Sequence, residues 1–271
     1  MMLKTLKNWS FSFIVLVLFS AVPSLAQAQK AAGNFQGMWS DPPRTAVGEF
    51  CFAWCTDAGV EQLNKLLDDP ANDARPFAQL LADATKYQRD MYIRPRLTER
   101  ALKTFPLDPA DDPAFLRCEP PGVARQIFTR HQLQIREVSK DQLEFRYGEW
   151  DARRTIYMDG RKRPNNQVPT PLGHSVGHWE GNTLVIETSG ITPYIIFGNN
   201  GTHHSDQLRI VERYNRSQDG KTLSLAATME DPLTLREPVV LKKIWSWSPN
   251  SRIAPYKDCE RPTEFSKGVS Q

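Results

Sequence analysis

The chain has 271 residues, of which 40% are hydrophobic and 24% are charged, and its formal net charge is +3 at pH 7. This length suits one large domain, or one domain with an elaborated arm, whose core can be buried without help from metals. A charge so close to neutral gives no electrostatic basis for binding nucleic acid or an acidic membrane surface.

Residues 1–28 have the three parts of a cleaved secretory signal peptide. Lys4 and Lys7 form a positive segment, residues 11–21 are almost entirely apolar, and Ala26-Gln27-Ala28 offers small residues to a signal peptidase. Cleavage removes two lysines and no acidic residue, so the formal charge falls from +3 to +1. We therefore expect a periplasmic or secreted protein with no membrane attachment after cleavage; a retained membrane anchor is the alternative.

Four cysteines, Cys51, Cys55, Cys118 and Cys259, form an even set in a chain predicted to be exported. Such a set indicates two disulfides, for which three connectivities are possible. We favour Cys51–Cys55 as a local link and Cys118–Cys259 as a long-range link. A metal site is the alternative, but Cys51-x-x-x-Cys55 has no second pair of matching spacing.

Residues 29–117 are predicted to form an N-terminal segment that carries a helical arm. Apolar residues recur at spacings of three and four over 60–67 and 77–87, and Pro70 ends the first run. Residues 98–102 look like a short third helix, and a connector rich in Pro and Asp follows. Core packing is the simplest use of these apolar stripes.

Residues 118–260 are strand-like, and 261–271 form a C-terminal tail. Eight segments rich in β-branched and aromatic residues alternate with turn sequences such as Asp159-Gly160 and Asp219-Gly220. The predicted strands are 126–138, 142–149, 153–159, 175–180, 182–189, 207–215, 221–230 and 239–247. Eight short antiparallel strands in meander order favour a closed barrel, because closure removes exposed edges.

The predicted fold is therefore mainly β: a lipocalin-like antiparallel barrel of about eight strands with an N-terminal helical arm. Phe35-Gln36-Gly37-Met38-Trp39 adds a Gly-x-Trp triplet that resembles the opening strand of lipocalin-like barrels. Long irregular loops at 164–172 and 190–206 interrupt the strands, and such loops on a rigid barrel are where sites tend to be built.

Histidines concentrate beside these two loops. Of five in the chain, His174, His178, His203 and His204 lie within 31 residues. In an extended segment 175–180, His178 and Glu180 share one face and Trp179 lies on the other. Glu212 and Tyr214 face the barrel interior if Leu208 and Ile210 do, and a buried Glu212 then needs a histidine or arginine partner.

Three interpretations of this cluster remain open. The first is acid–base chemistry, with His174 and His204 as acid and base and Glu212 orienting them. The second is a divalent metal held by the same three residues. The third is a purely structural role. Residues predicted to contact a substrate are Arg154, Asp159, His178, Trp179, Tyr194 and Tyr214.

The run from Gly173 to Thr188 resembles a motif, Gly-His-Ser-x-Gly-x-Trp-Glu-Gly-x-Thr-Leu-Val-x-x-Thr, of a largely uncharacterised family of exported bacterial proteins. The resemblance covers about residues 118–260 and includes Asp159, Ser175, His204 and Glu212, while His178 departs from the commonest form. Such exported proteins are associated with the breakdown of plant-derived aromatics. The resemblance implies a lyase that acts on a lignin-type phenolic dimer.

The sequence lacks the signatures of dinucleotide, phosphate-loop and zinc-protease sites. We therefore predict a lyase or isomerase that needs no cofactor and acts on a hydrophobic or aromatic small molecule. A non-catalytic binding protein of the periplasm and a metal-dependent hydrolase are the alternatives. An interaction module that uses the helical arm as its contact surface is a further one.

Overall fold

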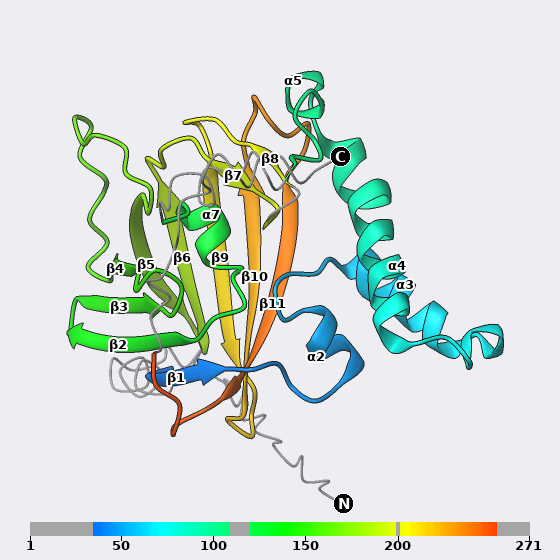
Figure 1. Cartoon of the computed structure of the whole chain (residues 1–271). Coiled ribbons are helices and arrows are strands. Elements are labelled where there is room, and N and C mark those ends of the chain that lie inside the picture. The colour runs from blue at the N-terminus through cyan, green and yellow to red at the C-terminus, as the bar shows by residue number, and fades with distance from the viewer. Residues whose placement is uncertain (1–34, 109–119, 199–200, 254–271) are drawn as a thin grey trace, which may run out of the picture.

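The computed structural model describes residues 35–108, 120–198 and 201–253. The barrel strands are β1 (Gly37–Ser40), β2 (Leu133–Ser139), β3 (Gln142–Tyr147), β4 (Arg153–Tyr157), β5 (His174–Glu180), β6 (Thr183–Ser189), β9 (Arg209–Arg216), β10 (Thr222–Glu230) and β11 (Val239–Trp247). They close in the order β1-β11-β10-β9-β6-β5-β4-β3-β2 (Figure 1). The short strands β7 (Ile195–Ile196) and β8 (Thr202–His203) form a separate pair. The predicted mainly β barrel is confirmed, and it has nine strands because the Gly-x-Trp triplet contributes β1.

The predicted meander is wrong at one place, where β4 and β5 run parallel. Residues 158–173 carry the chain from the end of β4 back to the end of the barrel at which β4 began. A parallel pair of strands requires such a long connection. A hairpin turn joins β5 to β6 instead, with Gly181 in the left-handed conformation at φ +59°. The irregular loop predicted after residue 163 is therefore the connection that makes this pair parallel.

The predicted strand 126–138 is also too long, because β2 begins only at Leu133. A short helix, α7 (Val123–Gln126), precedes it, and its residues Val123, Ala124 and Gln126 are fully buried in the barrel core. A short helix that is buried on several sides has no polar face. It therefore has no 3.6-residue period by which the sequence could distinguish it from a strand.

Side chains of alternating strand residues fill the barrel interior. Leu143, Phe145 and Tyr147 of β3 are at most 3% exposed, as the period-two pattern predicted. The ring of Tyr214 packs edge-on to Phe145, with a centroid separation of 5.4 Å, and is stacked 6.4 Å from Trp245. The centre of the barrel is thus an aromatic core with polar groups set among the rings.

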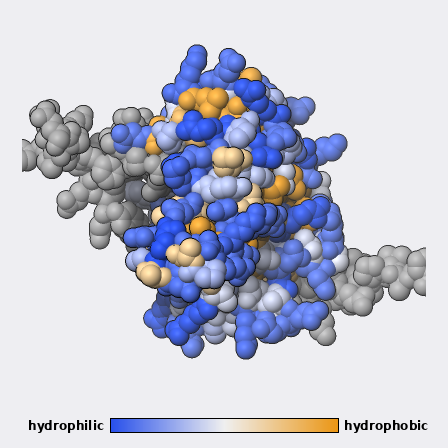
Figure 2. All heavy atoms as spheres, turned by 90° about the vertical axis from the view of Figure 1, so that its right-hand side faces the viewer, coloured by the Kyte–Doolittle hydropathy of each residue, from blue (hydrophilic) through white to orange (hydrophobic). Residues whose placement is uncertain are grey.

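The helical arm lies on the outside of the barrel beside β11 (Figure 1). It comprises α2 (Ala46–Phe50), α3 (Asp57–Asp68), η1 (Pro70–Asn72), α4 (Phe77–Tyr87), the π-helical turn η2 (Gln88–Ile93), η3 (Arg94–Arg96) and α5 (Glu99–Leu102). Leu63, Leu80 and Ala84 are buried in a small core of their own, against Ile244 of β11. Figure 2 shows that the outward face of the arm is mostly hydrophilic. Most of each amphipathic stripe therefore serves packing, as predicted, whereas Leu67, Phe77 and Tyr87 remain exposed.

The arm covers the edge of β11 that β1 leaves open, since β1 pairs with β11 only at Trp247 and Ser246. Farther along this edge, Lys242 N–H donates to the carbonyl of Cys55 at 2.8 Å, and Ile244 N–H donates to the carbonyl of Cys51 at 3.3 Å. Val240 N–H donates to the hydroxyl of Tyr92 at 3.4 Å. Alternate amides of β11 therefore find partners in the arm, which satisfies an edge that would otherwise be exposed.

A disulfide joins Cys51 to Cys55, which confirms the predicted local link. Cys118 and Cys259, the predicted signal peptide 1–28 and the predicted tail 261–271 lie outside the described residues. Among the residues that are described, no helix has both the length and the apolar content that a membrane span requires.

We expect a Cys51→Ser/Cys55→Ser variant to lose about 2 kcal/mol of unfolding free energy, a value at the low end for native disulfides because the loop is short. Amide exchange at Lys242 and Ile244 should accelerate, because the disulfide segment is their hydrogen-bond partner. Urea unfolding and hydrogen exchange measure the two effects. The amides of Leu225 and Ala227 in β10, which lies between β9 and β11, are the internal control; equal acceleration there would contradict the assignment.

Candidate functional site

The barrel interior contains an ion pair between Arg154 and Glu212. Arg154 lies on β4 and Glu212 on β9, and strands β5 and β6 separate them in the sheet. The side chains are only 1% and 0% exposed. The guanidinium donates from Nη1 to Oε2 at 3.0 Å and from Nη2 to Oε1 at 2.6 Å. This bidentate geometry provides the buried partner that an inward-facing Glu212 was predicted to need.

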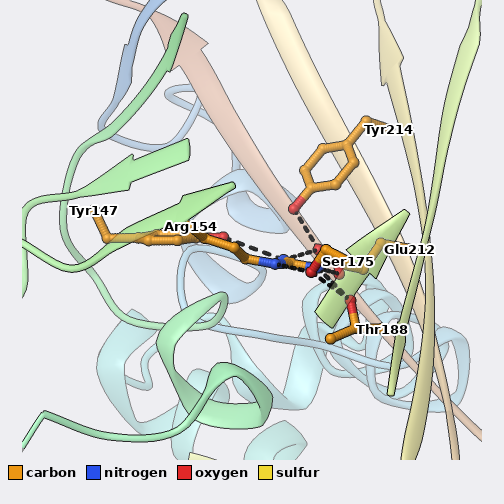
Figure 3. A network of polar contacts seen from close by, with 6 residues as sticks. All are labelled: Tyr147, Arg154, Ser175, Thr188, Glu212 and Tyr214. Atoms are coloured by element: carbon orange, nitrogen blue, oxygen red, sulfur yellow. Dashed lines mark hydrogen bonds and ion pairs between the residues drawn. The ribbon is translucent and has the colours of Figure 1, made fainter. Parts of the chain in front are cut away.

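Four hydroxyl groups surround this ion pair (Figure 3), and they belong to Tyr147, Ser175, Thr188 and Tyr214. Arg154 Nε donates to Ser175 at 2.7 Å, and the Tyr214 hydroxyl donates to Glu212 at 2.8 Å. Burial raises the pKa of Tyr147 to about 12 and raises the pKa of Tyr214 well above its ordinary value. Both phenols are therefore protonated at neutral pH. We interpret this network, whose members bond to one another, as a structural tie across the barrel.

His204 lies in the loop that follows β8 and is 1% exposed. Its Nδ1 donates to the carbonyl of Ser205 at 2.8 Å, and its Nε2 accepts from the backbone N–H of Tyr194 at 3.1 Å. These two contacts select the neutral tautomer with the proton on Nδ1, and burial lowers the pKa of His204. Both ring nitrogens are thus used: Nδ1 bonds within its own segment, and Nε2 joins that segment to the one that contains Tyr194.

His174 lies at the start of β5 on the outer surface of the barrel wall. Its ring stacks on Tyr157 at a centroid distance of 5.1 Å. His178, farther along the same outer face, contacts Glu180 at 3.2 Å. Asp159 accepts a hydrogen bond from Arg161 at 2.9 Å, and this pairing lowers the pKa of Asp159 to about 2. These predicted site residues therefore lie outside the barrel.

The remaining predicted contact residues are also dispersed. Trp179 points to the other face of β5, as predicted, and packs against Phe35 at a ring-centroid distance of 5.0 Å. Tyr194 lies beside α7, where its Cβ is 3.5 Å from the position that a side chain at Gly122 would occupy. The structure thus brings together Arg154, Tyr214 and Glu212, and it places the other predicted residues elsewhere.

The contacts of the three predicted catalytic residues do not overlap. His174 contacts Tyr157, His204 contacts Tyr194 and Ser205, and Glu212 contacts the Arg154 network. Across residues 35–108, 120–198 and 201–253, no group of three His, Cys, Asp or Glu side chains is arranged to hold a metal ion.

A different polar cluster lies around Lys243, on the inward-facing row of β11. Lys243 is 1% exposed; its Nζ donates to the carbonyl of Thr129 and lies 4.5 Å from the centre of the Trp245 ring. Burial lowers its pKa to about 7, and the charge of Glu149 opposes that shift. An amine in this environment can exchange a proton near neutral pH, which an ordinary lysine cannot.

Hydrogen-bonding capacity around Lys243 is left unused. Three buried atoms there have no partner: Oε2 of Glu149, Oε1 of Gln126 and Nε1 of Trp245. Gln126 Nε2 donates to the backbone carbonyl of Glu149 at 3.2 Å, so α7 and the β3–β4 loop meet at this point. Buried polar atoms without partners are rare, and they indicate a place where water or a ligand completes the bonding.

Glu149 and Thr129 also line a cavity of about 340 Å³ between the arm and the barrel. The other lining residues are Ala53, Trp54, Arg125, Phe128, Arg130, His131 and Gly198. A second cavity of about 190 Å³ shares Ala53, Trp54 and Arg130 with the first, and it extends along the arm towards Phe105 and Phe197. Aromatic rings beside cationic side chains suit a planar or anionic small molecule.

Left-handed backbone at non-glycine residues is confined to this part of the described structure. Trp150 and Asp151, with φ of 61° and 52°, directly follow Glu149, and Phe197, with φ of 65°, precedes Gly198. Such conformations cost of order 1–3 kcal/mol each and cluster at functional sites. Their position beside the cavities that Glu149, Phe197 and Gly198 line makes this region the stronger candidate site.

The sequence carried one signal for this site that the histidine cluster obscured. Lys243 falls at an inward position in the period-two run of Val239, Leu241 and Trp245. A lysine on the buried face of a strand is rare unless it is paired or used. Glu149 and the arm residue Trp54 had no such signal, because only the tertiary fold places them beside β11.

The sequence matches no protein-family model, no curated protein and no solved structure.

We expect Glu212→Gln to lower the free energy of unfolding by about 3 kcal/mol or more, because it leaves the buried guanidinium of Arg154 without its counter-charge. Glu180→Gln is the matched control, since Glu180 pairs with Arg213 at 2.7 Å on the exposed face. An exposed pair contributes about 1 kcal/mol or less. Urea unfolding measures both, and equal losses would contradict a structural role for the buried pair.

Lys243 should make stability depend on pH. Its pKa is about 7 in the folded protein and rises to 10.5 on unfolding, so the unfolded chain binds more protons between these values. Stability should therefore rise with pH across this window, by up to about 1.4 kcal/mol per pH unit, and the gain should disappear in Lys243→Met. Lys242→Met, which removes the neighbouring outward-facing lysine, should keep it. Urea unfolding at a series of pH values measures the effect. The same pH dependence of the unfolding free energy in wild type and Lys243→Met would contradict this assignment.

Proposed function

We propose that this protein is an exported, cofactor-independent enzyme of the lyase or isomerase type that acts on a hydrophobic or aromatic small molecule. The observation that carries the proposal is the buried amine of Lys243, with a pKa of about 7, which donates to the carbonyl of Thr129. Thr129 and Glu149 in turn line the 340 Å³ cavity. The reacting groups in this proposal are Lys243 and Glu149. His174, His204 and Glu212 are not required.

The proposed chemistry is proton transfer. Neutral Lys243 takes a proton from an acidic C–H of the substrate, and the electron pair of that bond forms a new double bond. In an isomerase the ammonium returns the proton to another carbon, and in a lyase it protonates the departing oxygen. Positioned acid–base groups contribute about 10²–10⁴-fold to the rate, most efficiently when the pKa lies near the working pH.

The cavity lining supports a substrate with an aromatic ring and a developing negative charge. Trp54 and Phe128 provide the apolar wall, and the guanidinium of Arg130 lies where it can stabilise an oxyanion. A phenolic dimer of the lignin type, the substrate class implied by the family resemblance, has both features. Export to the periplasm or beyond is part of the same proposal and rests on the signal-peptide pattern.

A non-catalytic binding protein is the second candidate, and one observation favours it. Lys243 Nζ is bonded to the backbone of Thr129 and is almost fully enclosed. In this interpretation the amine and Glu149 orient a bound ligand without reacting.

Turnover of a panel of phenolic dimers by residues 29–271, with and without EDTA, tests the enzyme proposal. We expect activity that survives EDTA, rises with pH through about 7 as Lys243 loses its proton, and falls by about 10²-fold or more in Lys243→Met. Glu149→Gln should also reduce turnover, whereas Lys242→Met, on the outer face of the same strand, should not.

Three outcomes would overturn the assignment. Equal activity of Lys243→Met and Lys242→Met would remove Lys243 from the chemistry. Tight binding of a panel member, detected by tryptophan fluorescence, with no product formed would support the binding protein. Activity that EDTA abolishes would instead support the alternative of a metal-dependent hydrolase.

A further inference from the structure

A third cavity, of about 260 Å³, lies on the outer surface of the barrel where the β4–β5 loop crosses β5 and β6. Its charged and histidine side chains are Arg161, Lys162, Arg163, His174, His178 and Glu187. It shares no lining residue with the two cavities between arm and barrel. Any function here is therefore independent of the proposed enzyme activity.

His174 provides the evidence that this cavity is a built site. Its side chain lines the cavity, the residue is 7% exposed, and its Nε2 is buried without a hydrogen-bond partner. The stacked ring of Tyr157 holds the imidazole in place. A buried polar atom without a partner, in a ring that lines a cavity, indicates a missing hydrogen-bonding partner.

Positive charge in the cavity exceeds negative charge. Glu187 is already paired with Arg209 of β9, and Asp159 is paired with Arg161. Lys162 and Arg163 add two further cations at the rim. Arg163 is packed where a side chain at Gly190 would stand, 2.3 Å from that position, so its guanidinium is fixed in place.

The electrostatic environment of His174 is consistent with this excess. Burial lowers the pKa of His174, and the charges of Arg163 and Arg161 lower it further. The imidazole is therefore neutral in the empty cavity at neutral pH. A bound anion would offset the arginine charges and favour a protonated ring.

We propose that this cavity binds a small soluble phosphate or sulfate monoester. The arginine and lysine side chains match a doubly charged oxyanion, and Nε2–H of His174 completes its hydrogen bonds. A cavity of about 260 Å³ is larger than an inorganic anion needs, and the space that remains accommodates the organic part of the ester. Ser189 in the lining provides a hydroxyl for that part.

Phenyl phosphate is the probe, with phenol as the uncharged comparison. The ring resonances of His174 should shift on titration with phenyl phosphate and not with phenol. The pKa of His174 should rise when the ligand is bound. The groups that surround this ring are Tyr157, Arg161, Lys162, Arg163, His178 and the Glu187–Arg209 pair. The affinity for phenyl phosphate should therefore increase as the pH falls towards the pKa of His174 in the complex.

Lys162→Gln/Arg163→Gln should weaken binding by about tenfold or more, because charge-assisted hydrogen bonds are lost. His174→Gln, which leaves the loop cations in place, should weaken binding while circular dichroism confirms an unchanged fold. Lys65→Gln removes a charge from the exposed face of α3 and should have no effect. Equal losses in the Lys65 and loop variants would overturn the proposal. So would an unresponsive His174 ring, or binding confined to vesicles of phosphatidylglycerol.

Discussion

The rest of the structure depends on closure of one sheet edge. Strand β1 is too short to pair along β11, and it leaves the amides of Val240, Lys242 and Ile244 facing outwards. An open edge of this kind invites pairing with other chains. The arm removes that hazard by bringing Cys51, Cys55 and Tyr92 to these amides. The position of the arm is thus a consequence of backbone hydrogen bonding, and the disulfide holds the segment that does it.

Placing the arm at this edge also creates the cavity. Ala53 and Trp54 lie between the two cysteines, so the segment that covers β11 also forms one wall of the space. The opposite wall comes from the residues that follow α7 and from the β3–β4 loop. Cavity shape is therefore coupled to the disulfide segment, and a ligand bound there would stabilise the closed barrel by mass action.

The barrel interior buries two cations, and their different surroundings suggest different roles. Arg154 has a bidentate carboxylate and several hydroxyl groups, which offset the cost of removing its charge from water. Lys243 has one backbone carbonyl and a tryptophan ring, and atoms without partners lie nearby. An arginine that is fully paired stabilises the fold. A lysine that is poorly paired costs stability, and proteins tolerate such a cost where the amine has a use.

The sequence predicted those features that depend on local pattern. Alternation identified the strands, and helical spacing identified the arm, but chain proximity misled the search for a site. His174 and His204 are close in sequence, yet one lies outside the barrel wall and the other in a loop, because strand pairing separates them. Lys243 acquires its pKa only through burial, and Glu149 reaches it only through the fold. Left-handed backbone at Trp150 belongs to the hairpin turn between β3 and β4. A bulky residue rarely adopts this conformation, so the surrounding contacts must hold it. Local rules therefore fail where the fold builds its cavity, and that failure is itself an argument for function there.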